Sequence, residues 1–225
     1  MTALFVTATG TDIGKTFVSA GLIRHIRAAG KPVAAIKPVV SGFDPADWQA
    51  SDPAVLLAAL GRPLTLEEVD GVSPWRFKAP LSPHTAAQRE GRAIEFQELV
   101  AFCRRAMAAR RGMLLVEGIG GVMVPLDDRH SVLDLMSMLR IPIILVAGSY
   151  VGTLSHTLTA LEVVARRNLD IAAVVVSESN SSAASLEDTV ATIQVFAETI
   201  DVVGIPRLPP GACEHAAFAR LGAMI

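Results

Sequence analysis

The chain has few of the features that mark several large classes of protein. Only two of its 225 residues are cysteine, Cys103 and Cys213, and each stands beside an apolar residue, far from the other in the sequence. A disulfide framework and a cysteine-rich metal site are therefore excluded, and we expect both thiols to be small buried groups in a reducing compartment. The first residues lack the basic region, apolar core and cleavage site of a signal peptide. No apolar run reaches the length of about 18 residues that a membrane span needs. We therefore expect a cytoplasmic protein with no membrane partner.

The chain also has no marked excess of positive or negative charge. The chain has 20 Lys and Arg residues against 22 Asp and Glu residues, a formal net charge of -2, and no block of basic residues. This argues against a nucleic-acid partner or a membrane-surface role. Repeats, low-complexity segments and linkers are absent, and 51% of the residues are hydrophobic. We therefore expect residues 1–225 to form a single domain with a full core.

Apolar runs alternate with stretches of helical periodicity. The runs that predict strands cover residues 4–6, 33–36, 113–116, 142–146, 171–176 and 202–205. The stretches that predict helices cover residues 15–29, 95–110, 152–167 and 184–199. Strands this apolar are buried on both faces, which predicts an α/β fold: a doubly wound, mostly parallel sheet in three layers. Residues 41–91 have an irregular pattern with both tryptophans, and we expect ligand-binding loops there.

The most informative segment is the start of the chain. The apolar run Leu4–Val6 leads into small residues that end in Gly14, Lys15 and Thr16. A loop of this kind directs backbone N–H groups at a polyphosphate, and the following helix favours anions at its N-terminal end. In a P-loop, the lysine reaches the terminal phosphates and the hydroxyl ligates Mg²⁺. The strict pattern requires glycine where Thr9 stands, so the P-loop NTPase-like fold is predicted from the strand and helix around the motif as well.

A second lysine follows the next predicted strand. Lys37 comes directly after residues 33–36, and Pro38, Ser41 and Gly42 follow it. Since parallel strands end at one edge of a sheet, Lys37 should project into the same crevice as Lys15. Two ammonium groups in one crevice require an anion, so we expect a functional role for Lys37 instead of a solvated surface position.

Two acidic residues are candidate metal ligands. Glu117 ends the strand predicted at residues 113–116 and precedes Gly118 and Gly120, and a carboxylate there is the usual second anchor for Mg²⁺ beside a phosphate loop. Asp52 precedes an apolar helix, where it either caps that helix or binds metal. The local sequence leaves both interpretations of Asp52 open.

His84 lies in a segment with two prolines, where Pro83 and His84 shape a helix start. A lone histidine at such a position is more often a hydrogen-bonded structural group than a catalytic base. We therefore prefer the structural interpretation of His84.

Together these segments resemble the dethiobiotin synthetase family, the P-loop ligases of biotin biosynthesis. The order and the spacing of that family's motifs agree along nearly the whole chain. The matching segments are residues 7–16, 37–42, 51–52, 82–91, 116–121, 151–156 and 204–206.

The resemblance implies a homodimer that uses Mg-ATP and CO₂, or bicarbonate as its source, to close a ureido ring on 7,8-diaminononanoate. CO₂ and one amine form a carbamate, the γ-phosphoryl group is transferred to it, and the second amine attacks the resulting carbamic-phosphoric anhydride. The products are dethiobiotin, ADP and phosphate. Bringing a carbamate against a triphosphate needs positive charge between them, which Lys15 and Lys37 would supply as catalytic residues.

The resemblance also implies roles for individual residues. Thr16, Asp52 and Glu117 would bind Mg²⁺, which favours the metal interpretation of Asp52. The residues expected to meet the diamine and its carboxylate are Thr11, Asp12, Ser41, Gly152, Thr153 and Ser155. The last three form a helix start that the neighbouring subunit is expected to supply. The expected nucleotide contacts are Asp12, Ile13, Gly14, Lys15, Thr16, Phe17, Asp52, Glu117, Gly118, Ile119, Gly120, Ser177, Glu178, Pro206, Arg207 and Leu208.

The chain departs from the family pattern at a few positions. Ala8, Gly10 and Asp12 replace other residues of the loop, which changes its geometry without removing its function. Ser177 stands where the family usually has an asparagine whose amide reads the adenine edge. One hydroxyl cannot make the paired donor and acceptor contacts of an amide, so we expect relaxed use of other nucleoside triphosphates. Ser155 replaces a family asparagine near the substrate carboxylate.

Three alternative functions can be compared with the sequence, and each has a feature that argues against it. A catalytically silent P-loop module that senses nucleotide would keep Lys15 but would not need Lys37. A partition ATPase requires a signature lysine where Gly10 stands. An amide-forming relative would generally carry a glutaminase domain, for which this chain has no room.

Overall fold

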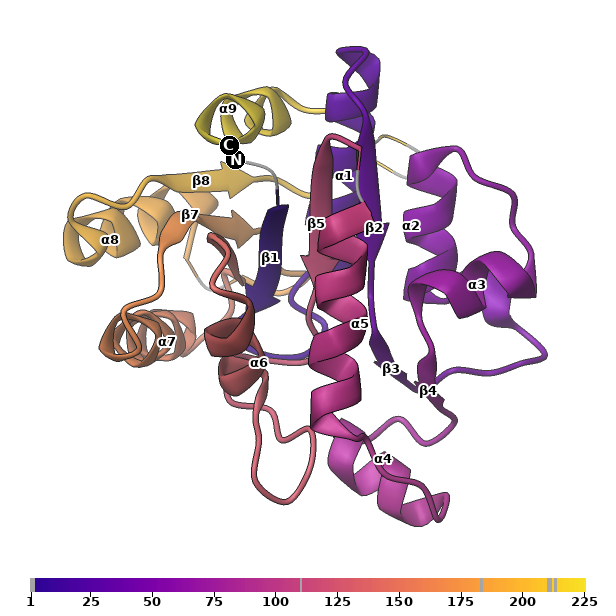
Figure 1. Cartoon of the computed structure of the whole chain (residues 1–225). Coiled ribbons are helices and arrows are strands. Elements are labelled where there is room, and N and C mark those ends of the chain that lie inside the picture. Colours follow the sequence, from indigo (N-terminus) through magenta and orange to yellow (C-terminus); the bar gives the residue numbers. More distant parts are fainter. Residues whose placement is uncertain (1–2, 110, 183, 210–211, 213) are drawn as a thin grey trace.

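The computed structural model describes residues 3–109, 111–182, 184–209, 212 and 214–225. Its centre is a six-stranded sheet with the order β2-β5-β1-β6-β7-β8, in which all neighbours run parallel (Figure 1). The strands of this sheet are β1 (Ala3–Ala8), β2 (Val33–Ile36), β5 (Met113–Glu117), β6 (Ile143–Ala147), β7 (Ile171–Ser177) and β8 (Val202–Ile205). The sequence predicts all six, with small differences at their ends.

Helices cover both faces of the sheet. The first face carries α5 (Phe96–Ala109), α6 (Val132–Leu139), α7 (Thr153–Arg166) and α8 (Leu186–Ala197). The second face carries α1 (Lys15–Ala28), α2 (Asp52–Leu60) and α9 (Ala216–Met224). Along β1, Phe5 packs with the first set of helices, while Leu4 and Val6 pack with the second, as the two-residue repeat of a strand requires. The predicted three-layer, doubly wound parallel fold is confirmed.

The strand register brings the predicted site residues to one edge of the sheet. Val6 of β1 pairs with Glu117 of β5, and Ala8 pairs with Val146 of β6. Because the strands are parallel, the loops after β1, β2, β5 and β7 all leave at the same edge, where open α/β sheets bind their ligands.

The description of residues 41–91 as irregular is wrong, although helices do begin at Asp52 and Pro83. This stretch contains η1 (Trp48–Ala50), α2, α3 (Leu66–Val72), β4 (Trp75–Phe77) and α4 (Pro83–Arg89), and β4 pairs in parallel with β3 (Val39–Ser41). Five buried side chains hold this part together, namely Val40, Phe43, Leu57, Val69 and Val72. Elements this short are stabilised by tertiary packing and leave little local pattern in a sequence. Neither α6 nor α9 is predicted either.

The expectations about the cysteines and about membrane spans can be compared with the structure. Cys103 is fully buried in α5, and burial raises the pKa of its thiol to about 12, as expected for an inert core residue. Cys213 lies outside the described residues. Among the helices that the structure describes, none has both the length and the hydropathy to cross a bilayer.

Candidate active site

The loop between β1 and α1 has the backbone conformation of a phosphate-binding loop. Gly14 precedes α1 with a φ of 101°, and Asp12 also has a positive φ, 57°. A Cβ atom on Gly14 would lie 2.7 Å from Ser177 Oγ, so glycine is required both by the backbone and by the close approach of β7. The first residues of α1, whose N–H groups have no partner within the helix, line a pocket that this loop borders.

Lys15 is held at the base of this loop. Its side chain is buried and its Nζ donates a hydrogen bond to the Gly10 carbonyl oxygen at 3.0 Å. Burial, and then the charge of Lys37, lower the pKa of Lys15 to about 8. The ammonium group is therefore destabilised in the free protein, and an anion that enters the pocket would stabilise it.

Lys37 makes a buried network with two carboxylates. Its Nζ lies 2.6 Å from Glu117 Oε1 and 2.9 Å from Asp52 Oδ2. Burial opposes the charge, but Glu117 and Asp52 outweigh it, so the pKa of Lys37 lies above its ordinary range. Burial also opposes the charge of Asp52, and Lys37 nevertheless keeps the pKa of that carboxyl below its usual value. The Asp52 side chain faces Lys37 instead of capping α2.

The oxygen atoms around Glu117 could hold a hard cation. Thr16 Oγ1 donates to Glu117 Oε1 at 2.6 Å, which places the hydroxyl beside the carboxylate. Glu117 Oε2 is buried and has no hydrogen-bond partner among the described residues. A buried carboxylate oxygen without a partner is costly, and a cation or an ordered water would satisfy it. The described residues contain no cluster of three or more His, Cys, Asp or Glu side chains with metal-binding geometry, so any cation here would need ligands from a phosphate or from water.

Lys15, Thr16, Lys37 and Asp52 line a cavity of about 340 Å³, which we call the lysine pocket. Glu117 is buried and is not among the lining residues. Its lining includes most of the residues predicted to bind phosphate, metal and the reacting diamine. The lining residues are Thr11, Asp12, Ile13, Gly14, Lys15, Thr16, Phe17, Lys37, Val40, Ser41, Asp52, Ile119 and Gly120. Gly118 lies behind this lining, with its carbonyl oxygen 3.5 Å from Lys37 Nζ.

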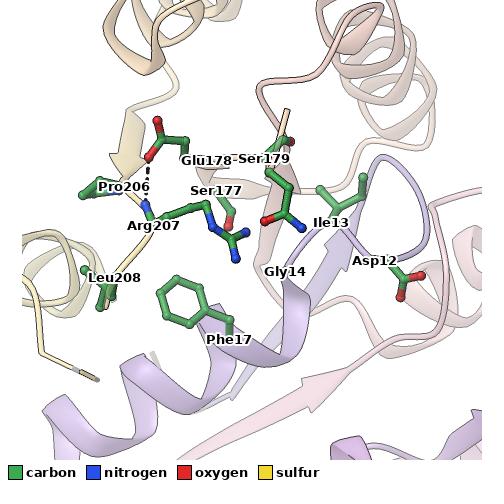
Figure 2. A pocket seen from close by; sticks show the side chains of 11 residues that line it. Asp12, Ile13, Gly14, Phe17, Ser177, Glu178, Ser179, Pro206, Arg207 and Leu208 are labelled. Atoms are coloured by element: carbon green, nitrogen blue, oxygen red, sulfur yellow. Dashed lines mark hydrogen bonds between the residues drawn. The ribbon is translucent and has the colours of Figure 1, made fainter. Parts of the chain in front are cut away.

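A second cavity, of about 310 Å³, adjoins the lysine pocket across Ile13, Gly14 and Phe17. We call it the arginine pocket, because Figure 2 shows the Arg207 guanidinium directed towards the space between Phe17 and Ser177. Pro206, Leu208 and Glu178, for which nucleotide contacts are predicted, also line it. The backbone N–H of Arg207 donates to Glu178 Oε2 at 2.9 Å, which joins the loops after β7 and β8.

A third cavity, of about 410 Å³, lies on the other side of the phosphate loop. Thr11 borders both this cavity and the lysine pocket, so the two adjoin. Its lining is mostly apolar and includes Met123, Val124 and Val163, and we call it the apolar pocket. His156, in the first turn of α7, is also part of its wall.

The helix start predicted to bind a carboxylate is separate from the lysine pocket. Gly152 precedes α7 with a φ of 93°, and Ser155 is exposed. The Thr153 hydroxyl donates to the Gly148 carbonyl oxygen at 2.7 Å, so this side chain is already used within the loop. None of Gly152, Thr153 and Ser155 is among the residues that line the three described pockets.

The sequence analysis assigned no role to three residues that line the lysine and arginine pockets, and of the residues that line the apolar pocket it assigned a role to Thr11 alone. Ser179 and Asn180 line the arginine pocket, and Val40 lines the lysine pocket. Ser179 and Asn180 could have been identified as pocket residues from their position just after the end of the strand at Ser177. His84 is hydrogen-bonded to Asp128 at 2.8 Å, in agreement with the structural interpretation of this residue.

Comparison with known proteins identifies the family. A family model described as an AAA domain, AAA_26, matches residues 2–211. ATP-dependent dethiobiotin synthetase BioD of Caulobacter vibrioides is 49% identical over 208 residues, which cover 92% of this chain and 93% of that protein. The chain belongs to the dethiobiotin synthetase family. The BioD proteins of Acidiphilium cryptum and Phenylobacterium zucineum are 51% and 47% identical over 79% and 97% of this chain, and over 80% and 92% of their own lengths.

Membership of the dethiobiotin synthetase family confirms the resemblance seen in the motifs. A solved structure titled as apo McdA from Cyanthece matches with a TM-score of 0.53, covers all of this chain and 91% of its own, and is 10% identical. At that identity the likeness shows the fold alone. The family assignment therefore rests on the BioD relatives, and nothing in these comparisons favours the silent nucleotide-sensing module.

Proposed function

We propose that this protein catalyses the ATP-dependent carboxylation and ring closure of 7,8-diaminononanoate with CO₂, forming dethiobiotin, ADP and phosphate. The observation that supports this most directly is the pair of buried ammonium groups, Lys15 and Lys37, in one pocket of a chain from this family. A nucleotide sensor needs only the first lysine. A reaction that brings a second anion against the triphosphate needs both.

The chemistry explains this need. An amine nitrogen of the substrate attacks CO₂ and loses a proton, which gives a carbamate. A carbamate oxygen then attacks the γ-phosphorus of ATP, and ADP leaves. The second amine attacks the carbonyl carbon of the mixed anhydride, its N–H proton is released, and phosphate leaves as the ring closes. Alignment and electrostatic stabilisation make up most of what phosphoryl transfer requires of the protein.

Lys15 and Lys37 are the catalytic residues in this proposal. Lys15 lies at the start of α1, where it would meet the terminal phosphates together with the backbone N–H groups of the loop. Lys37 is kept protonated by Glu117 and Asp52, so its charge is available at the point where the carbamate and the γ-phosphate approach each other. Thr11 and Ser41 border the same pocket and would orient the diamine end.

We also propose that Thr16, Asp52 and Glu117 hold Mg²⁺. The unpartnered Glu117 Oε2, the Thr16 hydroxyl beside it and the Asp52 carboxylate provide the hard oxygen atoms that this ion prefers. Mg²⁺ would neutralise charge on the β- and γ-phosphates when it is bound with ATP.

The remaining parts of the substrates fit the adjoining cavities. The base of the nucleotide would occupy the arginine pocket, and the hydrocarbon chain of the diamine would occupy the apolar pocket. Its carboxylate would meet the N–H groups at the start of α7. The Thr153 hydroxyl is already bonded to Gly148, whereas the exposed Ser155 hydroxyl has no hydrogen-bond partner among the residues that the structure describes and could donate to this carboxylate. We propose that a homodimer brings this helix start to the partner's site and that the enzyme acts in the cytoplasm.

Product formation tests the proposal. The purified protein is incubated with 7,8-diaminononanoate, bicarbonate, Mg²⁺ and ATP, and the mixture is analysed by mass spectrometry for the cyclic urea and by a phosphate assay. We expect both products, and neither when the diamine is omitted. Tight binding of ATP without any cyclic urea would contradict the proposal and favour the nucleotide-sensing module.

A further inference from the structure

Two loops that border different parts of the site are joined by serine side chains. Ser149 follows β6, and Ser179 follows β7. The Ser149 N–H donates to Ser179 Oγ at 3.0 Å, and the Ser179 N–H donates to Ser149 Oγ at 2.9 Å. The Ser182 hydroxyl donates to the Ser149 carbonyl oxygen at 2.6 Å. We call Ser149, Ser179 and Ser182 the serine clasp.

The serine clasp is tightly packed around Ser149, whereas Ser179 is half-buried and Ser182 is exposed. Ser149 is 2% exposed, and a Cβ atom on Gly148 would lie 2.7 Å from Ser179 Oγ. Each of the two reciprocal bonds joins a backbone N–H of one loop to a side chain of the other. Separating the loops would leave the buried Ser149 N–H and hydroxyl without these partners, which is costly, so the two loops should order together.

The loops that the serine clasp joins serve different ligands in the proposed reaction. Ser179 is part of the arginine pocket, two residues from Ser177. On the other loop, the Gly148 carbonyl oxygen accepts the hydrogen bond from Thr153 in the first turn of α7. An unbroken path of hydrogen bonds and one peptide unit therefore runs from the wall of the arginine pocket to the start of α7.

We propose that Ser179 is a positioning residue, which couples occupation of the arginine pocket by a nucleotide base to the ordering of the α7 start that receives the substrate carboxylate. This inference rests on the proposed function. In the proposed homodimer, the nucleotide bound to one subunit would prepare the carboxylate site that serves the other.

The physical basis is shared ordering. A ligand that orders one loop also orders the loop joined to it, so a second ligand loses less conformational entropy when it binds. Such coupling is reciprocal, because the factor by which nucleotide tightens diamine binding equals the factor by which diamine tightens nucleotide binding. Typical couplings lie between about 5-fold and about 150-fold.

Binding measurements on three variants test this coupling. Ser179→Ala removes the acceptor of the Ser149 N–H, whereas Ser179→Thr keeps a hydroxyl at this position. Ser185→Ala is the matched control, since Ser185 caps α8 through the Asp188 N–H at 3.0 Å and makes no hydrogen bond to the serine clasp. Calorimetry gives the Kd of 7,8-diaminononanoate with and without a non-hydrolysable ATP analogue, and the Kd of the analogue with and without the diamine.

We expect the analogue to tighten diamine binding by about 5-fold or more in the natural protein, in Ser179→Thr and in Ser185→Ala. In Ser179→Ala the factor should fall to about 1, with each ligand still bound on its own. Should Ser179→Ala fail to fold, Ser182→Ala removes the exposed hydroxyl that contacts the carbonyl oxygen and Oγ of Ser149, and should give an intermediate factor. An unchanged factor in a folded Ser179→Ala or Ser182→Ala variant would overturn the proposal.

Hydrogen exchange provides a readout that needs neither the diamine nor turnover. Adding the ATP analogue alone should protect backbone amides of residues 150–156 in the natural protein and in Ser179→Thr, but not in Ser179→Ala. Equal protection in Ser179→Ala, or none in the natural protein, would overturn the coupling. Failure of the proposed function is recognised separately, as absence of dethiobiotin in the product assay of the natural protein.

Discussion

Lys37 and Glu117 form a buried ion pair at the centre of the candidate active site. The Nζ of Lys37 lies 2.6 Å from Glu117 Oε1, and the two side chains are 4% and 1% exposed. The pair joins the end of β2 to the end of β5, so the catalytic charge and the proposed metal ligand hold each other in place. Changes to either residue should therefore affect both chemistry and stability, and the two effects can be measured separately.

Replacing Lys37 should slow the reaction strongly while ATP still binds. We expect Lys37→Met to lower kcat by about 10²- to 10³-fold, as for the loss of one group that stabilises charge in a transition state. Steady-state assays and calorimetry with ATP measure the two properties. Lys31→Met, at an exposed position after α1, is the control and should retain activity. Full turnover by Lys37→Met would contradict the role assigned to this residue.

Removing the charge of Glu117 should destabilise the fold. Glu117→Gln removes the more deeply buried of the two carboxylates that pair with Lys37. We expect the free energy of unfolding to fall by about 3 kcal/mol, at the low end for a broken buried pair, because Asp52 remains as a counterion and the amide oxygen still accepts a hydrogen bond. Urea denaturation provides the measurement. Glu162→Gln, in an exposed pair with Arg166, should change stability by about 0–1 kcal/mol. Equal losses in the two variants would show that the buried pair contributes no special stability.

The low pKa of Lys15 predicts a pH dependence of nucleotide binding. Phosphate attracts the ammonium form, and that form is lost in the free protein as the pH rises through about 8. We therefore expect the affinity for an ATP analogue to be high below this pH and to fall by up to about tenfold per pH unit above it. Calorimetry from about pH 7 to about pH 9.5 measures this. Lys15→Met should bind the ATP analogue weakly at every pH, with no change of affinity near pH 8. An affinity that does not change with pH in the natural protein would contradict the role assigned to Lys15.

The lowered pKa of Lys15 also makes the free energy of unfolding depend on pH. Between the folded pKa of Lys15 at about 8 and its ordinary value of 10.5, the unfolded chain holds the proton and the folded chain does not. Lys15 therefore makes stability rise with pH across this window, and its unfavourable contribution is fully present below about 8. Comparison of denaturation midpoints for the natural protein and Lys15→Met should show this slope only when Lys15 is present.

Ser177 predicts weak discrimination among nucleotide bases. Its single hydroxyl cannot make the paired contacts of an amide, and the arginine pocket contains no other assigned reader of the adenine edge. We expect kcat/KM with CTP and GTP to lie within about tenfold of the value with ATP, since the missing bidentate pair of contacts would carry about 1–3 kcal/mol of discrimination. Ser177→Asn should increase the preference for ATP. A strong ATP preference in the natural protein would mean that another group reads the base, and Asn180 is then the first residue to replace.

Gly21 should be intolerant of any side chain, although it lies inside a helix. A Cβ atom there would lie 2.1 Å from Phe218 Cζ, so Gly21→Ala should push α9 away from α1. We expect destabilisation of about 1–3 kcal/mol from overpacking, despite the higher helix propensity of alanine. Gly71→Ala is the control, because no atom lies within 4 Å of its Cβ position. Thermal unfolding compares the two, and adding Phe218→Leu should restore part of the loss.

Much of the fold and of the site follows from local pattern. Strands buried on both faces leave long apolar runs, so all six strands of the main sheet are predicted, and parallel pairing then places Lys15, Lys37 and Glu117 at one edge. A phosphate loop is contiguous in sequence because backbone N–H groups of consecutive residues surround the anion. For that reason its residues, and the family to which the chain belongs, can be recognised without coordinates.

Contacts between segments far apart in the chain could not be predicted in this way. The sequence leaves Asp52 open between helix cap and ligand, and only the fold brings its carboxylate to 2.9 Å from Lys37. The parallel pairing of β3 with β4 and the serine clasp between Ser149 and Ser179 likewise depend on tertiary packing. Short polar residues carry no periodic signal, and their partners are chosen by the geometry of the sheet edge. Local sequence therefore specifies the six strands of the main sheet, its longer helices and the phosphate loop. The three-dimensional arrangement specifies the short elements of residues 41–91 and which charges and hydroxyl groups meet.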